Sequence, residues 1–170
     1  KRVGLIMRKR FGEVISKLAD ENENIIVIVA DIGYRVFDDF REKYPERFIN
    51  MGICEQSIIS VASGMALEGL EPWVYTITPF LIERPFEQIK LDIDHQNVNV
   101  NLVGYADYPT LGPTHTELNA KKTMELFTNI KSFYPSDGNE TETMLLQAYE
   151  RNGPTFTSLK TDPNPMKPGA

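Results

Sequence analysis

Short runs of apolar, β-branched residues alternate with helix-like segments along almost the whole chain, and this alternation limits the possible folds. The clearest run, residues 25–30 (IIVIVA), is typical of a strand that is covered on both faces. Just before it, Phe11, Val14, Ile15 and Leu18 follow helical spacing. We therefore expect an α/β fold with a mostly parallel, twisted sheet of about six strands and helices on both faces.

The remaining elements follow from the same patterns. Strands are expected at residues 47–52, 72–77, 98–104, 130–135 and 154–160, and helices at residues 55–69, 84–96, 117–127 and 139–150, with a short helix or loop at 37–48. In parallel sheets, binding sites gather at the carboxyl ends of the strands. Three segments should lie there, namely residues 30–37, 50–56 and 105–117.

Charge and composition exclude several classes of protein. The net charge of −6 and the lack of a basic block longer than RKR (residues 8–10) argue against a nucleic-acid surface. No apolar run approaches the roughly 18 residues that a membrane helix needs. Cys54 is the single cysteine, so an internal disulfide is impossible, which fits a reducing compartment such as the cytoplasm. We expect one domain at residues 1–161 and a Pro/Gly-rich tail at 162–170.

The stretch FINMGICEQ (residues 48–56) places a carboxylate, Glu55, where an apolar run ends and helical sequence begins. One interpretation is a first-turn carboxylate that interacts favourably with the helix dipole. The other is a half-buried carboxyl group that exchanges a proton with a ligand. The residues alone leave both interpretations open.

Longer segments carry a family resemblance. Residues 47–74 (RFINMGICEQSIISVASGMALEGLEPWV) are followed in order by PFLIERPFEQI (79–89), LGPTH (111–115) and PSDGNE (135–140). This ordered set resembles the pyrimidine-binding domain of the transketolase family of thiamine diphosphate enzymes, over roughly residues 7–160. The resemblance implies that Glu55 matches the glutamate that hydrogen-bonds a ring nitrogen of the cofactor's aminopyrimidine. Sharing that proton helps the cofactor to lose the proton of its thiazolium carbon.

The resemblance also suggests further cofactor-binding residues. Phe80 matches the aromatic residue that stacks on the aminopyrimidine, and Phe86 is a second candidate; core packing is the alternative for each. Asp31, after the first strand, matches an aspartate near the positively charged thiazolium, although it could instead cap a turn or a helix.

Substrate contacts are implied at three positions. His115 matches a histidine near the substrate hydroxyls, and we count it as catalytic with Glu55. Arg84 matches an arginine that relatives resembling deoxyxylulose-phosphate synthase direct toward substrate, and Arg8 matches one that reaches substrate phosphate. A solvated or paired surface role is the alternative for both arginines. Leu111 replaces an acidic residue of many relatives, which puts the usual acceptor sugar in doubt.

The chain lacks the GDG motif with which the family holds the diphosphate and Mg²⁺, and it lacks the family's third domain. We therefore expect no metal ligand here and a separate GDG-containing subunit that holds the metal and the diphosphate, in an α2β2 assembly. An excised piece of a longer chain is the alternative.

The predicted reaction is the transfer of a two-carbon ketol unit from a ketose to an aldehyde. Three alternatives remain for the function. The chain could be a beta-type subunit of a 2-oxoacid dehydrogenase or of a deoxyxylulose-phosphate synthase-like enzyme. It could also be a non-catalytic α/β binding domain, with Asp31 placed like a phospho-acceptor. Finally, Cys54 could act as a nucleophile with His115.

Overall fold

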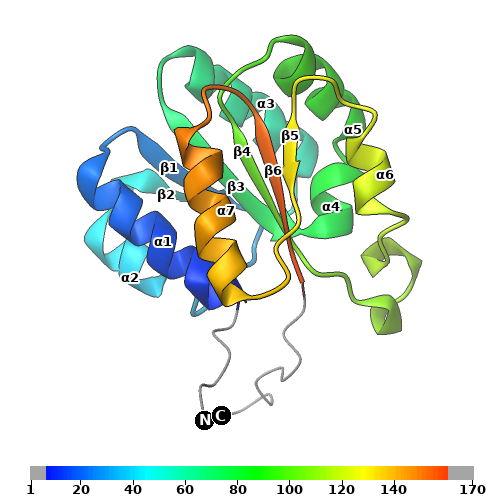
Figure 1. Cartoon of the computed structure of the whole chain (residues 1–170), viewed down its shortest axis with the longest axis horizontal. Coiled ribbons are helices and arrows are strands. Elements are labelled where there is room, and N and C mark those ends of the chain that lie inside the picture. The colour runs from blue at the N-terminus through cyan, green and yellow to red at the C-terminus, as the bar shows by residue number, and fades with distance from the viewer. Residues whose placement is uncertain (1–6, 161–170) are drawn as a thin grey trace.

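The computed structural model describes residues 7–160, so the tail predicted at 162–170 lies outside the described residues. A six-stranded, wholly parallel sheet crosses the molecule in the order β2-β1-β3-β4-β6-β5 (Figure 1). The α/β fold predicted from the sequence is confirmed. The strands are β1 (Ile25–Val29), β2 (Phe48–Asn50), β3 (Glu71–Ile77), β4 (Asn101–Tyr105), β5 (Lys131–Phe133) and β6 (Thr155–Leu159).

Helices cover both faces of the sheet, as expected. One face carries α1 (Met7–Glu21), α2 (Asp38–Lys43) and α7 (Gly138–Glu150), and α1 lies beside α7 (Figure 1). The other face carries α3 (Glu55–Leu67), α4 (Thr78–Ile82), α5 (Phe86–Gln88) and α6 (Ala120–Met124). A π-helix, η2 (Ile89–His95), continues α5, and 3-10 turns occur at η1 (Pro45–Arg47), η3 (Pro109–Leu111) and η4 (Pro113–His115). No helix within residues 7–160 is both long enough and apolar enough to cross a bilayer.

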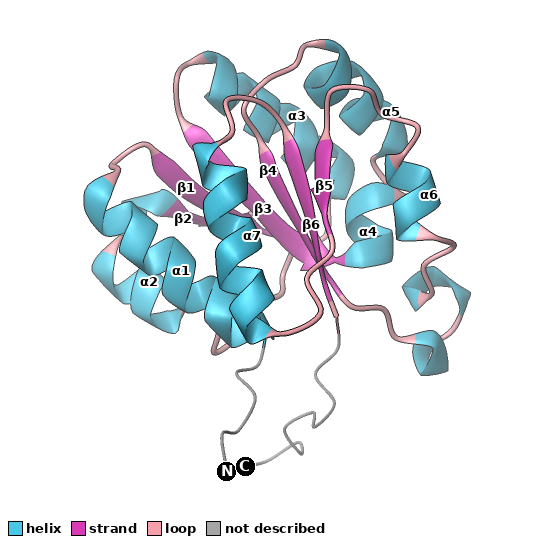
Figure 2. Ribbon diagram, in the orientation of Figure 1, coloured by secondary structure: helices cyan, strands magenta, loops and turns pink. Residues whose placement is uncertain are grey.

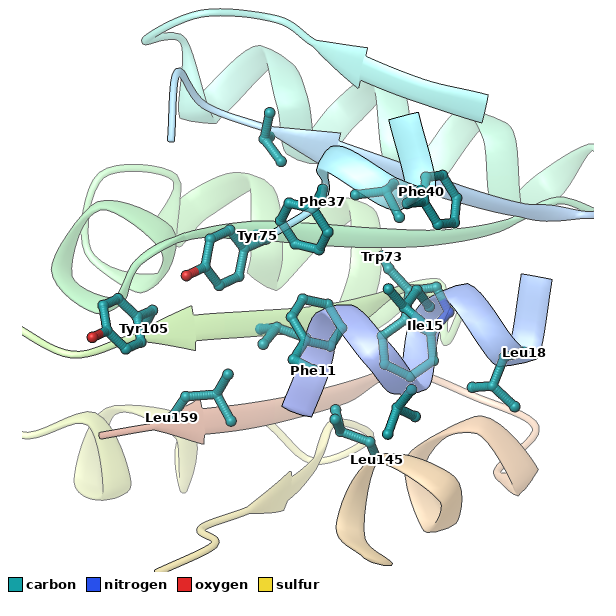
Figure 3. Close-up of a cluster of buried hydrophobic side chains, with 14 of the residues drawn as sticks. Phe11, Ile15, Leu18, Phe37, Phe40, Trp73, Tyr75, Tyr105, Leu145 and Leu159 are labelled. Carbon is teal, nitrogen blue, oxygen red and sulfur yellow. The ribbon is translucent and has the colours of Figure 1, made fainter. Parts of the chain in front are cut away.

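An aromatic layer fills the space between the sheet and α1 (Figure 3). Side chains alternate along β3, so that Trp73 and Tyr75 enter this layer while Val74 joins the apolar layer on the opposite face. Phe11 of α1 is fully buried, with its ring centroid 6.0 Å from Trp73 and 5.6 Å from Tyr75. This packing fixes α1 against the centre of the sheet.

Three helical segments differ from the expectation. Residues 78–82 were not predicted as a helix, yet they form α4 directly after β3. The helix expected at 84–96 is divided into α5 and the π-helix η2. The helix expected at 117–127 ends earlier, at Met124, and starts later, at Ala120, because Asn119 caps it by accepting a hydrogen bond from the backbone amide of Lys122 at 3.0 Å.

Gly104 allows α4 to approach the sheet closely. A Cβ atom at this position of β4 would lie 2.8 Å from Oγ1 of Thr78, the first residue of α4. We expect Gly104→Ala to lower the free energy of unfolding by about 1–3 kcal/mol, because the new methyl group overpacks this contact. Denaturant unfolding measures the change.

The matched control is Gly64→Ala in α3, where an added Cβ atom meets nothing within 4 Å. Because alanine favours a helix over glycine, we expect a gain of up to about 1 kcal/mol. If both substitutions lowered the free energy of unfolding equally, the effect at Gly104 would not come from its contact with Thr78.

Candidate functional site at the carboxyl edge of the sheet

The segments that carry the predicted site residues all follow the carboxyl ends of strands. Asp31 follows β1, Glu55 begins the helix after β2, Phe80 lies in α4 after β3, and His115 lies in the loop after β4. Because the strands are parallel, these ends meet at one edge of the sheet (Figure 2). The three segments predicted at this edge are therefore found there.

Two turns at this edge have a backbone conformation that is unfavourable for side-chain-bearing residues. Asp31 and Ala106, which follow β1 and β4, both have a φ of 53°. The left-handed region costs such residues roughly 1–2 kcal/mol, and strained backbone of this kind is concentrated at functional sites.

Asn50, the last residue of β2, fixes the turn at Asp31. The Asp31 amide donates to Asn50 Oδ1 at 3.0 Å, and Asn50 Nδ2 donates to Asp31 Oδ1 at 3.3 Å. The Gly52 amide also donates to Asn50 Oδ1, at 3.0 Å. Sequence reasoning missed Asn50, although a polar residue that ends a strand at the expected site edge was an available signal.

Glu55 is the first residue of α3 and is only 6% exposed. Its Oε1 accepts a hydrogen bond from Arg84 Nη1 at 2.9 Å, so the buried carboxylate has a charged partner. The preceding residue, Cys54, makes no side-chain bond to the helix, and its Sγ donates to the Met51 carbonyl at 3.0 Å. The position suits the helix dipole, and it also places a carboxyl group at the edge where parallel sheets usually bind ligands.

A row of contacts runs from Glu55 to His115. The guanidinium carbon of Arg84 lies 3.5 Å from the centroid of the Phe80 ring, within the range of a cation–π interaction. The Phe80 ring in turn meets the His115 ring at a centroid distance of 4.8 Å and an interplanar angle of 69°. The structure therefore brings together four of the residues singled out from the sequence.

A cleft of about 350 Å³ brings His115 together with two further candidates, Arg8 and Asp31. The Arg8 guanidinium lies 5.3 Å from the centroid of the Tyr105 ring beside it. The His115 carbonyl accepts from the Tyr108 amide at 2.7 Å, which holds the loop after β4 in place. The lining includes Arg8, Asp31, Tyr34, Tyr108, Leu111 and His115.

Phe86 lies elsewhere. Its ring centroid is 5.2 Å from that of Phe127, and it packs against the apolar layer beneath α3 and α4. This arrangement favours the core-packing interpretation of Phe86. Of the two aromatic candidates, Phe80 is the one in contact with Arg84, the partner of Glu55.

Glu55 and Phe80 together suit a flat ligand that carries N–H groups. The planar guanidinium of Arg84 already contacts the Phe80 ring and donates to the Glu55 carboxylate. An aminopyrimidine offers the same two features, a flat face and a polar nitrogen edge. The residues present therefore fit the pyrimidine half of thiamine diphosphate. Within residues 7–160 no group of three or more His, Cys, Asp or Glu side chains is arranged to hold a metal ion.

Comparison with known families decides the assignment. The sequence profile of the pyrimidine-binding domain of transketolase matches residues 4–162. The chain belongs to this family. The match agrees with the ordered motifs of the sequence and with the parallel sheet.

The relatives of this transketolase-type domain include proteins that are named as two different enzymes. The chain is 34% identical to a protein of Actinobacillus succinogenes that is named as one subunit of apulose-4-phosphate transketolase, over 91% of the chain and 50% of that protein. It is 33% identical to 1-deoxy-D-xylulose-5-phosphate synthase 1 of Geobacter metallireducens, over 85% of the chain and 23% of that protein. The chain thus spans half or less of the length of these two relatives.

A solved structure supports the same family. It is described as a split-gene transketolase in an inactive beta4 tetramer, and it superposes with a TM-score of 0.85 at 29% identity. The match covers 98% of the present chain and 56% of that chain.

A second hollow, of about 470 Å³, lies at the ends of β4 and β6 of this transketolase-type domain. Its lining includes Asp107, Glu117, Tyr134 and Lys160. Burial, followed by the neighbouring carboxylates of Asp107 and Glu83, raises the pKa of Glu117.

Proposed function

We propose that this domain forms the pyrimidine-binding part of a thiamine diphosphate-dependent, transketolase-like enzyme. The reaction is the transfer of a two-carbon ketol unit from a ketose donor to an aldehyde acceptor. The observation that carries the proposal is the contact row Glu55–Arg84–Phe80–His115 at the carboxyl edge of the sheet. Family membership and the apulose-4-phosphate transketolase relative support it.

Glu55 and Phe80 would bind and orient the cofactor. Thiamine diphosphate, when bound, supplies the carbanion chemistry that the reaction requires. The Glu55 carboxyl group would share a proton with a ring nitrogen of the aminopyrimidine, and its low exposure would limit competition from water. Phe80 would stack against the pyrimidine ring, which is worth about 0.5–1.5 kcal/mol beyond the burial of area.

The cleft that contains Arg8, Asp31 and His115 would receive the substrate. His115 would hydrogen-bond to substrate hydroxyl groups and move protons there. Asp31 would interact favourably with the positively charged thiazolium. Arg8 supplies a positive charge that favours a phosphorylated sugar, in keeping with the substrate in the name of the Actinobacillus succinogenes relative. Leu111, also in the lining, would exclude the acidic contact that many relatives make with the acceptor.

A partner subunit would hold the diphosphate and Mg²⁺ in an α2β2 assembly in the cytoplasm. Exposed apolar side chains surround the proposed site, with Tyr34 77% exposed, Ile53 72% and Leu111 63%. A group of apolar residues at a functional edge favours a surface that another protein covers. The relative from Actinobacillus succinogenes is itself named as one subunit of its enzyme, which also fits a two-chain arrangement.

Calorimetric titration tests the two-chain proposal. The natural protein that contains this domain is titrated with thiamine diphosphate and Mg²⁺, alone and after addition of the GDG-containing chain encoded beside it. We expect tight binding and ketol transfer only with both chains, because each supplies half of the cofactor site. Tight binding without the second chain would contradict the half-site proposal.

The relatives named 1-deoxy-D-xylulose-5-phosphate synthase favour a second candidate function. A synthase of that kind would use a 2-oxo acid as donor and release CO₂. The same reconstituted complex separates the two functions: transfer from a ketose without CO₂ supports the transketolase-like reaction, whereas release of CO₂ from pyruvate supports the second candidate.

A further inference from the structure

Arg84 makes the two contacts that the aminopyrimidine of the cofactor would make. Its Nη1 donates to Glu55 Oε1 at 2.9 Å, and its guanidinium carbon lies 3.5 Å from the centroid of the Phe80 ring. We infer that Arg84 is an internal ligand of the pyrimidine site, which competes with the cofactor for Glu55 and Phe80. This inference rests on the proposed function.

The competition follows from the distances. A separation of 3.5 Å is van der Waals contact, so a pyrimidine ring cannot stack on the same face of Phe80 while the guanidinium lies there. The bond from Arg84 likewise occupies Oε1, one of the two oxygens of the Glu55 carboxyl group. Stacking of the aminopyrimidine on this face of Phe80, together with a bond to Glu55 Oε1, therefore requires the Arg84 side chain to leave.

Arg84 is placed so that its side chain can turn into water when a ligand replaces it at Glu55. It lies between α4, which ends at Ile82, and α5, which begins at Phe86. Its side chain is 35% exposed, whereas that of Glu55 is 6% exposed. The arginine side chain can therefore rotate into water without moving either helix, while the carboxylate that it releases stays at the start of α3.

The ion pair also stabilises the chain when no ligand is bound. An unpaired carboxylate buried as deeply as Glu55 would be strongly destabilising, and Arg84 supplies the missing partner. A ligand that displaces Arg84 must replace both the stacking on Phe80 and the polar contact to Glu55. Arg84 therefore raises selectivity, because a flat ring without a polar edge would leave Glu55 without a partner.

Binding of thiamine diphosphate to the complete two-chain complex, measured by calorimetry with Mg²⁺ present, tests the inference. We expect Arg84→Gln to bind roughly three- to tenfold more tightly than wild type, since a partly exposed ion pair and a cation–π contact no longer compete. Arg84→Lys should lie between the two, because lysine keeps the charge but lacks a flat group that stacks on Phe80.

Arg41→Gln is the matched control. Arg41 also pairs with a carboxylate, that of Asp38 in its own helix, at 3.5 Å. It takes no part in the contact row that runs from Glu55 to His115. Its replacement should leave affinity unchanged. In a Glu55→Gln background the effect of Arg84→Gln should shrink, because the competing ion pair is already lost; a merely structural effect of Arg84 would persist there.

The outcomes separate the inference from the proposed function. If wild type binds the cofactor and Arg84→Gln binds equally or more weakly, the internal-ligand inference is wrong and the proposed function stands. If neither the wild-type nor the Arg84→Gln complex binds thiamine diphosphate, the proposed function fails and the inference fails with it.

Discussion

Replacing Glu55 with alanine should lower ketol transfer by about a hundred- to ten-thousand-fold in the complete complex, the usual range for the loss of a positioned acid–base group. The reason is that alanine cannot share a proton with the aminopyrimidine, whereas Phe80 would still stack on it. Initial rates at saturating thiamine diphosphate, Mg²⁺ and partner measure the effect, because saturation separates lost chemistry from weaker binding.

The fold should survive this substitution. The group left behind, Arg84, has a side chain that is 35% exposed, so water can solvate it. We expect the free energy of unfolding to change by only about 1 kcal/mol. Glu87→Gln is the control, since it removes an exposed carboxylate from the neighbouring helix α5 and should leave the rate near that of wild type. Wild-type turnover by Glu55→Ala would refute the proposed role of Glu55.

The frame of the fold could be predicted because its signals are local. The β-branched run at residues 25–30 and the helical spacing from Phe11 to Leu18 each report the surroundings of their own segment, and both elements are present as β1 and α1. The start of the last helix is equally local, since the side chain of Asp137 caps it by accepting from the amides of Asn139 and Glu140. In each case, the residues that form the pattern lie within a few positions of one another in the sequence.

The elements that were missed depend on distant contacts. Helix α4 (Thr78–Ile82) is short and lacks the polar face that identifies most helices in a sequence. Its position also depends on close contact with Gly104 in β4. Residues 84–96 form α5 and then the π-helix η2 rather than one α-helix. In η2, buried Asp94 accepts hydrogen bonds from the amides of Asn129 and Ile130. No window of local sequence contains both partners of these contacts.

The same limit applies to the candidate site. Glu55, Phe80, Arg84 and His115 could each be selected from motifs, and parallel strands place their segments at one edge. That Arg84 binds Glu55 and covers Phe80 could not be predicted, because the pairing depends on side-chain conformations across 29 residues of sequence. The internal competition inferred for the pyrimidine site is therefore a property that only the three-dimensional arrangement reveals.

The aromatic layer beneath the site should dominate stability. Phe11 is fully buried, and its ring centroid lies 5.4 Å from Phe37, in an edge-to-face arrangement, and close to Trp73 and Tyr75 (Figure 3). We expect Phe11→Ala to lower the free energy of unfolding by about 3–5 kcal/mol, because it removes a buried ring and leaves a cavity. Thermal or denaturant unfolding of the chain measures the loss.

Two further variants keep this prediction testable. Because the expected loss is a large share of the roughly 5–15 kcal/mol that stabilises a typical protein, Phe11→Ala can fail to fold. Phe11→Leu keeps most of the apolar volume and should lose less, about 1–2 kcal/mol. Leu126→Ala is the surface control: Leu126 is 69% exposed, so its truncation should change stability by about 0.5 kcal/mol or less.

Phe37 links this layer to the site, since a Cβ atom on Gly33 would lie 2.7 Å from its ring. A loosened Phe37 would disturb the turn that carries Asp31, so Phe11→Leu should weaken substrate binding more than Leu126→Ala does. Equal unfolding midpoints for all three variants and wild type would show that the layer does not support the fold.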